Sequence, residues 1–321
     1  MTAAGNPRSH WKSTVQGRAV PWCYSARLTP GATLQKERRA MCTQGQIPLW
    51  QSILMGVRLG GWKRGSMAVM TCYTDVGGSL SEIVLSPATL VSSPEKWQEF
   101  DRRWNDCLCA FEVSALHMKD FAHSRGEFSS WKLDEPKRRR FLNALMWIIE
   151  DTVEYSAAVA IYVADYNRVD QKYRLSESLR PYTLGCMSCA ARIIPWAKEA
   201  QHDKNDLIWI FEKGDQDQND LRKRWEIAYP DHFVDPIFLK KQDVYESKES
   251  RRIRPFEAAD LVGYENLLAH RLLAKKGEKR LFENLRKPMQ RLMKLKGGDL
   301  WGYLSETEIL SACSMSGIQL R

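Results

Sequence analysis

The sequence lacks any long hydrophobic run. The best candidate, residues 49–62, is interrupted by Gln51, Arg58 and several glycines, whereas a membrane-spanning helix needs about 20 consecutive apolar residues. Cysteine is also sparse, with eight residues at irregular spacing in a chain of 321. These two absences exclude a helical membrane protein and a small disulfide scaffold. The remaining composition, 44% hydrophobic and 27% charged, is typical of a folded globular protein.

Acidic residues are nearly absent from the first 66 residues, which hold ten Lys and Arg but only Glu37 among acids. This segment has no sustained helical or strand periodicity, so the sequence predicts a poorly ordered extension. Such a segment is typical of an organelle transit peptide or a nucleic-acid-binding arm. A start codon assigned too far upstream is the third alternative, which we favour because Met67 and Met70 begin the first strong strand pattern. No secretory signal pattern is present, and unpaired thiols fit a cytoplasmic location.

The net charge of +9 is unevenly distributed. Residues 67–270 carry 27 basic and 33 acidic side chains, and residues 271–296 carry ten basic and two acidic ones. The basic run 137–140 and the basic segment 271–296 are each candidates for binding a phosphate backbone, although such runs are more often solvated helix faces. Apolar positions within the second segment predict an amphipathic helix: Leu281, Phe282, Leu285, Met289 and Leu292.

From residue 67 onward, strand patterns alternate with helix patterns. Apolar, β-branched runs predict strands over 67–74, 80–85, 89–91, 157–164, 207–211 and 236–239. Helical spacing and capping residues predict helices over 95–107, 134–153, 183–200, 217–227 and 255–273. This order predicts an α/β fold with a mixed sheet flanked by helices. We therefore expect three parts: the extension 1–66, a domain over 67–275, and a basic helical segment over 276–321.

Carboxylates follow three of the predicted strands: Asp75, Asp165 and Glu212. In α/β sheets, ligands gather at the carboxyl ends of strands, although a single acid there is often only a turn residue. A fourth acid, Asp260, lies inside an apolar helical segment, on the face expected to meet the sheet. A lone buried charge costs several kcal/mol. Asp260 is therefore expected to pair with a buried arginine, to cap a loop or to bind a metal.

Four short motifs resemble those of the DUF3800 family, whose members have a ribonuclease-H-like fold. In chain order they are TCYTDVGGSL, ALHMKDF, IWIFEKGDQ and RPFEAADLVGYE, and the resemblance covers roughly residues 67–273. One departure stands in the first motif. The family usually has Asp-Glu-Ser-Gly, whereas this chain has Asp75, Val76, Gly77 and Gly78. The aspartate is retained and the second acid is not.

The resemblance implies a function through its acids. In ribonuclease-H-like nucleases, acids from the first strand, a neighbouring strand and a late helix hold divalent metals that drive phosphodiester hydrolysis. Carried onto this chain, Asp75, Glu212 and Asp260 would be the catalytic metal ligands, with Asp165 as a fourth. Carboxylates favour Mg²⁺ or Mn²⁺, and the substrate would be RNA or DNA. The alternative is a catalytically inactive member of the fold that binds nucleic acid or a protein partner.

Several other residues admit two interpretations. His117, in ALHMKDF, is a candidate for orienting a phosphate or moving a proton, or else a partly buried, hydrogen-bonded histidine. Cys186 and Cys189 have the spacing of a zinc or redox pair, but no second pair is nearby, so core packing is expected, as it is for Cys107 and Cys109. Core packing is also favoured over base stacking for four tryptophans: Trp131, Trp147, Trp209 and Trp301.

Overall fold

The computed structural model describes residues 70–79, 81–200, 207–212, 217–229, 236–239, 242–244, 250–276, 283, 285–296, 302–315 and 318. All of them belong to the compact unit Gly45–Arg321, and the other unit, Met1–Gln44, lies outside the described residues. The predicted extension 1–66 therefore also lies outside them. Among the described residues, no helix combines the length and the apolar composition needed to cross a membrane.

A mixed six-stranded sheet forms the centre of the described structure, which confirms the predicted α/β class. Across the sheet the strand order is β5-β4-β1-β2-β3-β8. The strands β1, β2 and β3 form an antiparallel series, β4 and β5 extend it in parallel from β1, and β8 is parallel to β3. Their bounds are β1 Met70–Gly78, β2 Val84–Ser92, β3 Tyr155–Tyr162, β4 Leu207–Glu212, β5 Ile237–Leu239 and β8 Gly302–Leu304.

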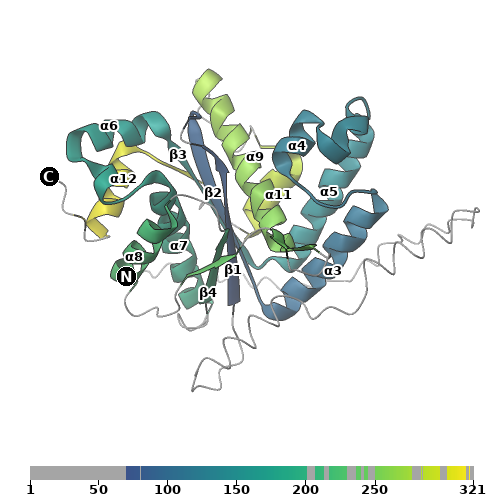
Figure 1. Ribbon diagram of the computed structural model, residues 1–321, viewed down its shortest axis with the longest axis horizontal. Helices are drawn as coiled ribbons and strands as arrows, with labels where there is room; N and C mark the ends of the chain where they lie inside the picture. The colour runs from purple at the N-terminus through teal and green to yellow at the C-terminus, as the bar shows by residue number, and fades with distance from the viewer. Residues whose placement is uncertain are drawn as a thin grey trace, which may run out of the picture. The chain divides into compact units, whose positions relative to one another are not determined.

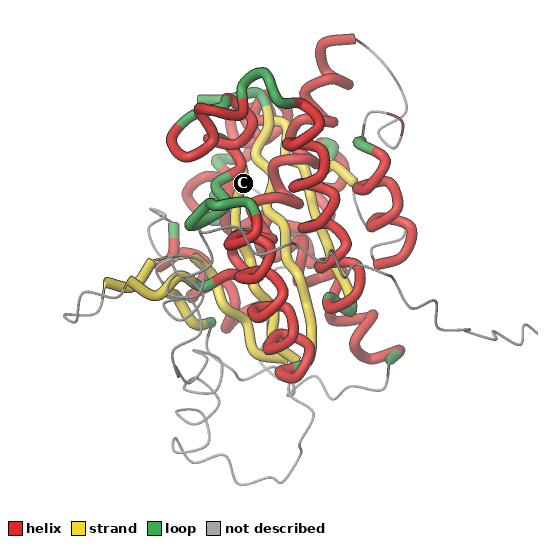
Figure 2. Tube along the Cα trace, turned by 90° about the vertical axis from the view of Figure 1, so that its right-hand side faces the viewer, coloured by secondary structure: helices red, strands yellow, loops and turns green. Residues whose placement is uncertain are grey.

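Helices cover both faces of this sheet. On one face, to the right in Figure 1, lie α3 (Pro94–Ala110), α4 (Met118–His123), α5 (Glu135–Thr152), α9 (Arg254–Lys276) and α11 (Lys287–Lys296). On the other lie α6 (Val163–Tyr173), α7 (Pro181–Glu199), α8 (Gln218–Ala228) and α12 (Glu306–Met315). Figure 2 shows the strands running in roughly the same direction as the helices that cover them.

Side-chain alternation along the strands explains this two-sided arrangement. On β1, Tyr73 packs into the core beneath α9, whereas Cys72 packs into the core beneath α7. On β4, Ile210 and Phe211 divide between the same two cores. Because successive strand residues point to opposite faces, a continuous apolar run is needed when both faces are covered.

The second strand is longer than the sequence predicts. Two short strands were expected around Pro87, but β2 runs unbroken through it, and all nine of its residues are buried. Its ladder to β3 pairs Leu85 with Ile161 and resumes where Ala88 pairs with Ala158. Pro87 lies in this gap, so its missing N–H group removes no bond from the ladder to β3.

The predicted starts of two helices are confirmed. The Ser93 side chain caps α3 by accepting a bond from the Lys96 N–H at 3.4 Å. The Asp134 side chain caps α5 by accepting from the Lys137 N–H at 2.9 Å. Each cap satisfies a backbone donor that has no partner within its helix.

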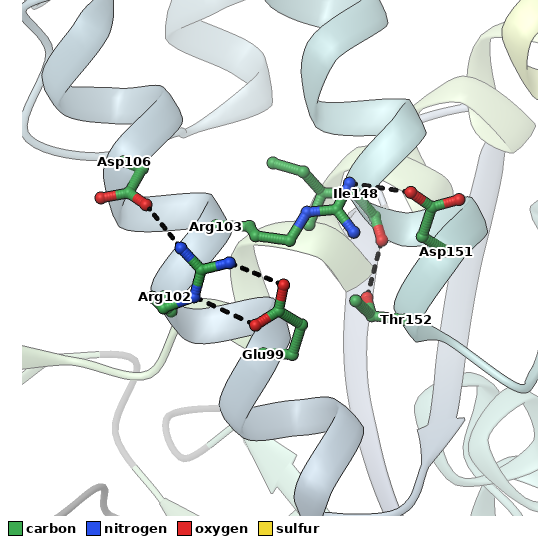
Figure 3. Close-up of polar contacts among 7 residues, drawn as sticks. All are labelled: Glu99, Arg102, Arg103, Asp106, Ile148, Asp151 and Thr152. Carbon is green, nitrogen blue, oxygen red and sulfur yellow. Dashed lines mark hydrogen bonds and ion pairs between the residues drawn. The ribbon is translucent and has the colours of Figure 1, made fainter. Parts of the chain in front are cut away.

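Surface ion pairs lie within α3, and one of them joins α3 to α5 (Figure 3). Arg102 bonds within α3 to Glu99 at 2.7 Å and to Asp106 at 3.1 Å. Arg103 reaches across to Asp151 of α5 at 2.8 Å. All of these side chains are substantially exposed, so each pair contributes little, typically below about 1 kcal/mol.

Several short elements were not predicted from the sequence, although the short strand predicted over 236–239 is present as β5. The strand expected through Ala164 ends at Tyr162, and α6 begins at the next residue. The structure also adds α4, the 3-10 helices Gly126–Trp131 and Leu175–Glu177, and a separate hairpin of β6 (Gln242–Val244) and β7 (Ser250–Arg252). In the C-terminal segment, Leu285, Met289 and Leu292 are buried as predicted. Strand β8 of that segment joins the main sheet, so the segment is not purely helical.

Candidate functional site

Two of the predicted site acids lie on neighbouring parallel strands: Glu212 is the last residue of β4, whereas Asp75 lies inside β1, which runs on to Gly78 and not to residue 74 as predicted. The register of β1 and β4 pairs Thr74 with Phe211, so Asp75 and Glu212 occupy the next position on each strand. Tyr73 and Ile210, two residues earlier, both pack beneath α9. Because side chains alternate with a period of two, Asp75 and Glu212 are directed to that same face.

Helix α9 lies very close to β1 and β2 at this end of the sheet. A Cβ atom added to Gly77 would lie 3.3 Å from the Gly263 carbonyl carbon, and one added to Gly263 would lie 2.9 Å from the Ser86 oxygen. Two glycines thus allow the backbones to approach where side chains would separate them. Asp260 lies one turn before Gly263 on α9, so the third predicted acid belongs to the same region.

The carboxylates themselves are held by backbone donors. Asp75 is buried and accepts a bond from the Val76 N–H at 2.8 Å. Asp260 is half-buried, and its Oδ2 accepts a bond from the Met118 N–H of α4 at 2.8 Å. Across the described residues, no group of three or more His, Cys, Asp and Glu side chains is arranged to hold a metal ion. The fold therefore brings the three acids to one face without gathering their carboxylates into a ready metal centre.

The fourth predicted ligand lies elsewhere. Asp165 is in the first turn of α6, where it forms an ion pair with Arg168. That helix packs its residues Tyr166 and Val169 into the core on the opposite face of the sheet. The strand before it, β3, is also separated from β1 by β2. The structure does not place Asp165 beside the other three acids.

His117 precedes α4 and is more exposed than the sequence suggested. Its side chain is 51% exposed, and its Nδ1 lies 3.2 Å from Asp120 Oδ2. The next residue, Met118, donates the backbone bond to Asp260. His117 is therefore an accessible imidazole next to the acid-bearing face.

Glu257 is a buried acid near the candidate site that was not predicted from the sequence. Its side chain is 1% exposed, and Oε2 accepts from Trp104 Nε1 at 2.9 Å and from the Leu116 N–H at 3.0 Å. Its Oε1 accepts from Arg254 Nη1 at 2.6 Å. The signal was available, because Glu257 is a charge among apolar helical residues, as is Asp260 one turn later. Together these two acids hold the segment that leads into α4.

A second buried polar cluster lies farther along α9. His270 is fully buried, with Nδ1 lying 3.1 Å from the Tyr162 hydroxyl. Burial lowers the pKa of His270 to about 4, because desolvation disfavours the charged imidazole. One turn earlier, Asn266 donates from Nδ2 to Ser86 Oγ at 2.9 Å. These groups join α9 to the middle of the sheet as neutral, hydrogen-bonded side chains.

The cysteine and tryptophan predictions have mixed outcomes. Cys186 and Cys189 are fully buried, which confirms core packing, and burial raises the pKa of Cys189 to about 12. Cys107 is partly buried against the core, but Cys109 is exposed, so its predicted packing is wrong. Among the tryptophans, Trp131 and Trp209 are core residues, Trp147 is 50% exposed, and Trp301 lies outside the described residues.

No family model, curated protein or solved structure matches this chain. The resemblance to the DUF3800 family and the ribonuclease-H-like fold it implies stay predictions. A function for this chain is therefore inferred from the positions of Asp75, Glu212 and Asp260.

Proposed function

We propose that this chain is a metal-dependent nuclease or a related phosphoryl-transfer enzyme. In this proposal, Asp75, Glu212 and Asp260 bind Mg²⁺ or Mn²⁺. The observation that carries it is the parallel pairing of β1 with β4, which puts Asp75 and Glu212 side by side on the face covered by α9. A first strand, its neighbour and a late helix are also the three elements that the ribonuclease-H-like resemblance requires.

The donor set suits a hard divalent cation by its chemistry, because all three side chains offer carboxylate oxygens. When bound, such a cation activates water and stabilises the leaving oxygen of a phosphodiester. The protein's own contribution is positional. The Met118 N–H holds the Asp260 carboxylate, and the exposed His117 imidazole beside it is placed to orient a phosphate group.

The altered first motif is compatible with this proposal. Val76 stands where the resembling family has its second acid, and Val76 packs against the core on the opposite face from α9. The replacement therefore removes no carboxylate from the face that carries Asp75. At the next position, Gly77 is required by its close contact with Gly263.

The second candidate function is a non-catalytic module that binds nucleic acid or a protein partner. It is favoured by one specific observation: across the part of the chain that the structure describes, no three ligating side chains are gathered for a metal. One oxygen of the Asp260 carboxylate also accepts a bond from the Met118 N–H. In this alternative, the acids would be structural.

The two candidate functions are separated by measuring nucleic-acid cleavage by the wild type and by variants of the three acids. Labelled single- and double-stranded RNA and DNA are incubated with Mg²⁺ or Mn²⁺ and either the wild type or Asp75→Asn, Glu212→Gln or Asp260→Asn. We expect the wild type to cleave and each variant to fall to background. The control is Asp106→Asn, an exposed acid on α3, which should cleave normally.

The same experiment gives the results that would contradict the nuclease proposal. If the wild type never cuts, or if the three variants cut as well as the control, the nuclease proposal is overturned. Binding that needs no metal, weakens steeply with salt and causes no strand scission would support the non-catalytic module.

A further inference from the structure

Two basic segments that are about 150 residues apart in the sequence meet in the structure. The run 137–140 belongs to the first turns of α5, and residues 286–291 lie at the start of α11, which packs against α5. Between them is an open cavity of about 650 Å³. Figure 1 shows both helices on the face of the sheet that also carries α9 and α4.

Positive charge exceeds negative charge around this cavity. Its lining includes five cationic side chains: Arg138, Arg139, Arg286, Lys287 and Arg291. Among the described residues that line it, two are acids, and both are paired: Glu135 with Arg139 at 3.0 Å and Glu150 with Arg291 at 3.0 Å. Arg286 also pairs, at 3.3 Å, with Glu265 of α9. A net positive cavity remains after these pairs are counted, which favours an anionic ligand.

The cationic side chains differ in how accessible they are to a ligand. Arg138 is 13% exposed and is fixed, since it donates to Ser124 Oγ at 2.8 Å and stacks over Phe121 at 4.5 Å. In contrast, Arg139 is 75% exposed and Arg291 50% exposed. Lys287 is also exposed. Arg286 is 40% exposed as well, so four of the cations are accessible to a ligand.

An aromatic surface lies beside these cations. Trp147 lines the cavity and is 50% exposed, whereas Trp131 and Trp209 are in the core. The Arg291 guanidinium lies 4.3 Å from the centre of the Trp147 ring. Accessible cations next to an exposed indole are the combination that binds the backbone and stacks the bases of single-stranded nucleic acid.

We infer that this cavity binds single-stranded RNA or DNA, with the backbone on Arg139, Lys287 and Arg291 and a base stacked at Trp147. A duplex keeps its bases within its own stack, so it would leave the indole without a partner. The inference deepens the proposed function by naming its substrate class, and it rests on that function for the fate of the bound strand.

Helix α4 connects this cavity with the acids. Phe121 of α4 lines the cavity, and Met118, one turn earlier, bonds to Asp260. A six-residue helix is about 9 Å long, which is a span of only a few nucleotides. A strand held at α5 and α11 is therefore close enough to extend along α4 towards the acid-bearing face.

The test measures binding of a fluorescent 12-nucleotide strand by anisotropy, with EDTA present so that no cleavage or metal is needed. Trp147→Ala should weaken binding about 5- to 150-fold, the effect of losing one base–aromatic stack. The double variant Arg139→Ala/Lys287→Ala should make the slope of log affinity against log salt shallower by about 1.4. Circular dichroism confirms that each variant is folded.

The matched control is Arg102→Ala. Arg102 is exposed and bonded to an acid of its own helix, as Arg139 is, but it lies on α3 outside the cavity lining. It should bind the strand as the wild type does. The inference is overturned if the cavity variants bind like this control, if duplex binds as tightly as the single strand, or if poly-glutamate displaces the strand at equal concentration.

The nuclease proposal and the strand-binding inference can be overturned independently of each other. Asp75→Asn should abolish cleavage and leave strand binding in EDTA unchanged, because Asp75 does not line the cavity. Strand binding at the cavity without any cleavage by the wild type would overturn the nuclease and leave the inference standing. Cleavage by the wild type with unaltered binding in the cavity variants would overturn the inference alone.

Discussion

Removing the Glu257 carboxylate should destabilise the fold strongly, because three donors depend on it. In Glu257→Ala, the Trp104 indole N–H and the Leu116 N–H lose their acceptor in a buried environment. Each unsatisfied buried donor costs about 1–3 kcal/mol. Arg254 also loses a partner but keeps Asn105 Oδ1 at 2.9 Å. The expected loss in the free energy of unfolding is about 3–5 kcal/mol, similar to breaking a buried ion pair.

The replacement Glu257→Gln separates hydrogen bonding from charge. Its amide oxygen can still accept from Trp104 and Leu116, but it no longer offers a negative charge to Arg254. We expect a smaller loss of about 1–2 kcal/mol. Urea unfolding followed by circular dichroism measures both variants. The control is Glu127→Ala, which removes an exposed carboxylate that accepts from the Ser114 N–H at 2.7 Å.

The order of these three losses tests the reasoning. We expect the control to lose less than about 1.5 kcal/mol, because exposed donors turn to water when an acceptor is removed. If Glu257→Ala costs no more than the control, the buried network does not stabilise the start of α9. If Glu257→Gln costs as much as Glu257→Ala, charge rather than hydrogen bonding holds the network together.

Three further predictions follow from other positions. Gly263→Ala should lower the free energy of unfolding by about 1–2 kcal/mol, because a Cβ atom 2.9 Å from a strand oxygen outweighs the gain in helix propensity. Gly302→Ala, whose added Cβ would lie 4.0 Å from Arg192 Nη2, should be nearly neutral in urea unfolding. The pKa of His270 is lowered to about 4, so the unfolded chain binds a proton at a higher pH than the folded protein does. The free energy of unfolding should therefore fall by about 3 kcal/mol from pH 6.5 to pH 4. The stabilities of wild type and His270→Gln should converge over that range, and stabilities that fall in parallel would contradict this. Cys109→Ser should remove one rapidly labelled thiol from the native protein, and the same replacement at buried Cys189 should remove none.

Long elements could be predicted from local sequence because their periodicity extends over many residues. The helix around Phe141 and Leu145 and the strand through Ile210 both formed as predicted. Short elements were predicted less well, because three residues carry no clear period. The run that forms β5 was predicted as a strand, whereas β8, which pairs with β3, was not. Pro87 predicted a break, but β2 tolerates it at a gap in its ladder, which is a property of the neighbouring strand.

The candidate site was also predicted in part from local sequence, and the rest depended on tertiary packing. The sequence identified Asp75, Glu212 and Asp260 as acids at predicted strand ends and on a buried helix face. The register directs Asp75 and Glu212 to the face covered by α9, the helix that carries Asp260. The sequence also suggested Asp165 by the same rule. That rule does not say which face the following helix covers, and α6 covers the other one.

The sequence by itself determined the α/β class, the main helices and strands, and the list of candidate acids, because these depend on local periodicity and residue chemistry. Only the tertiary structure decided which of them are neighbours. Strand order placed Glu212 beside Asp75, the contact between Gly77 and Gly263 set how closely α9 approaches, and packing of α11 on α5 joined two distant basic segments around Trp147. Such proximities arise from packing between segments far apart in the chain, which no local pattern records.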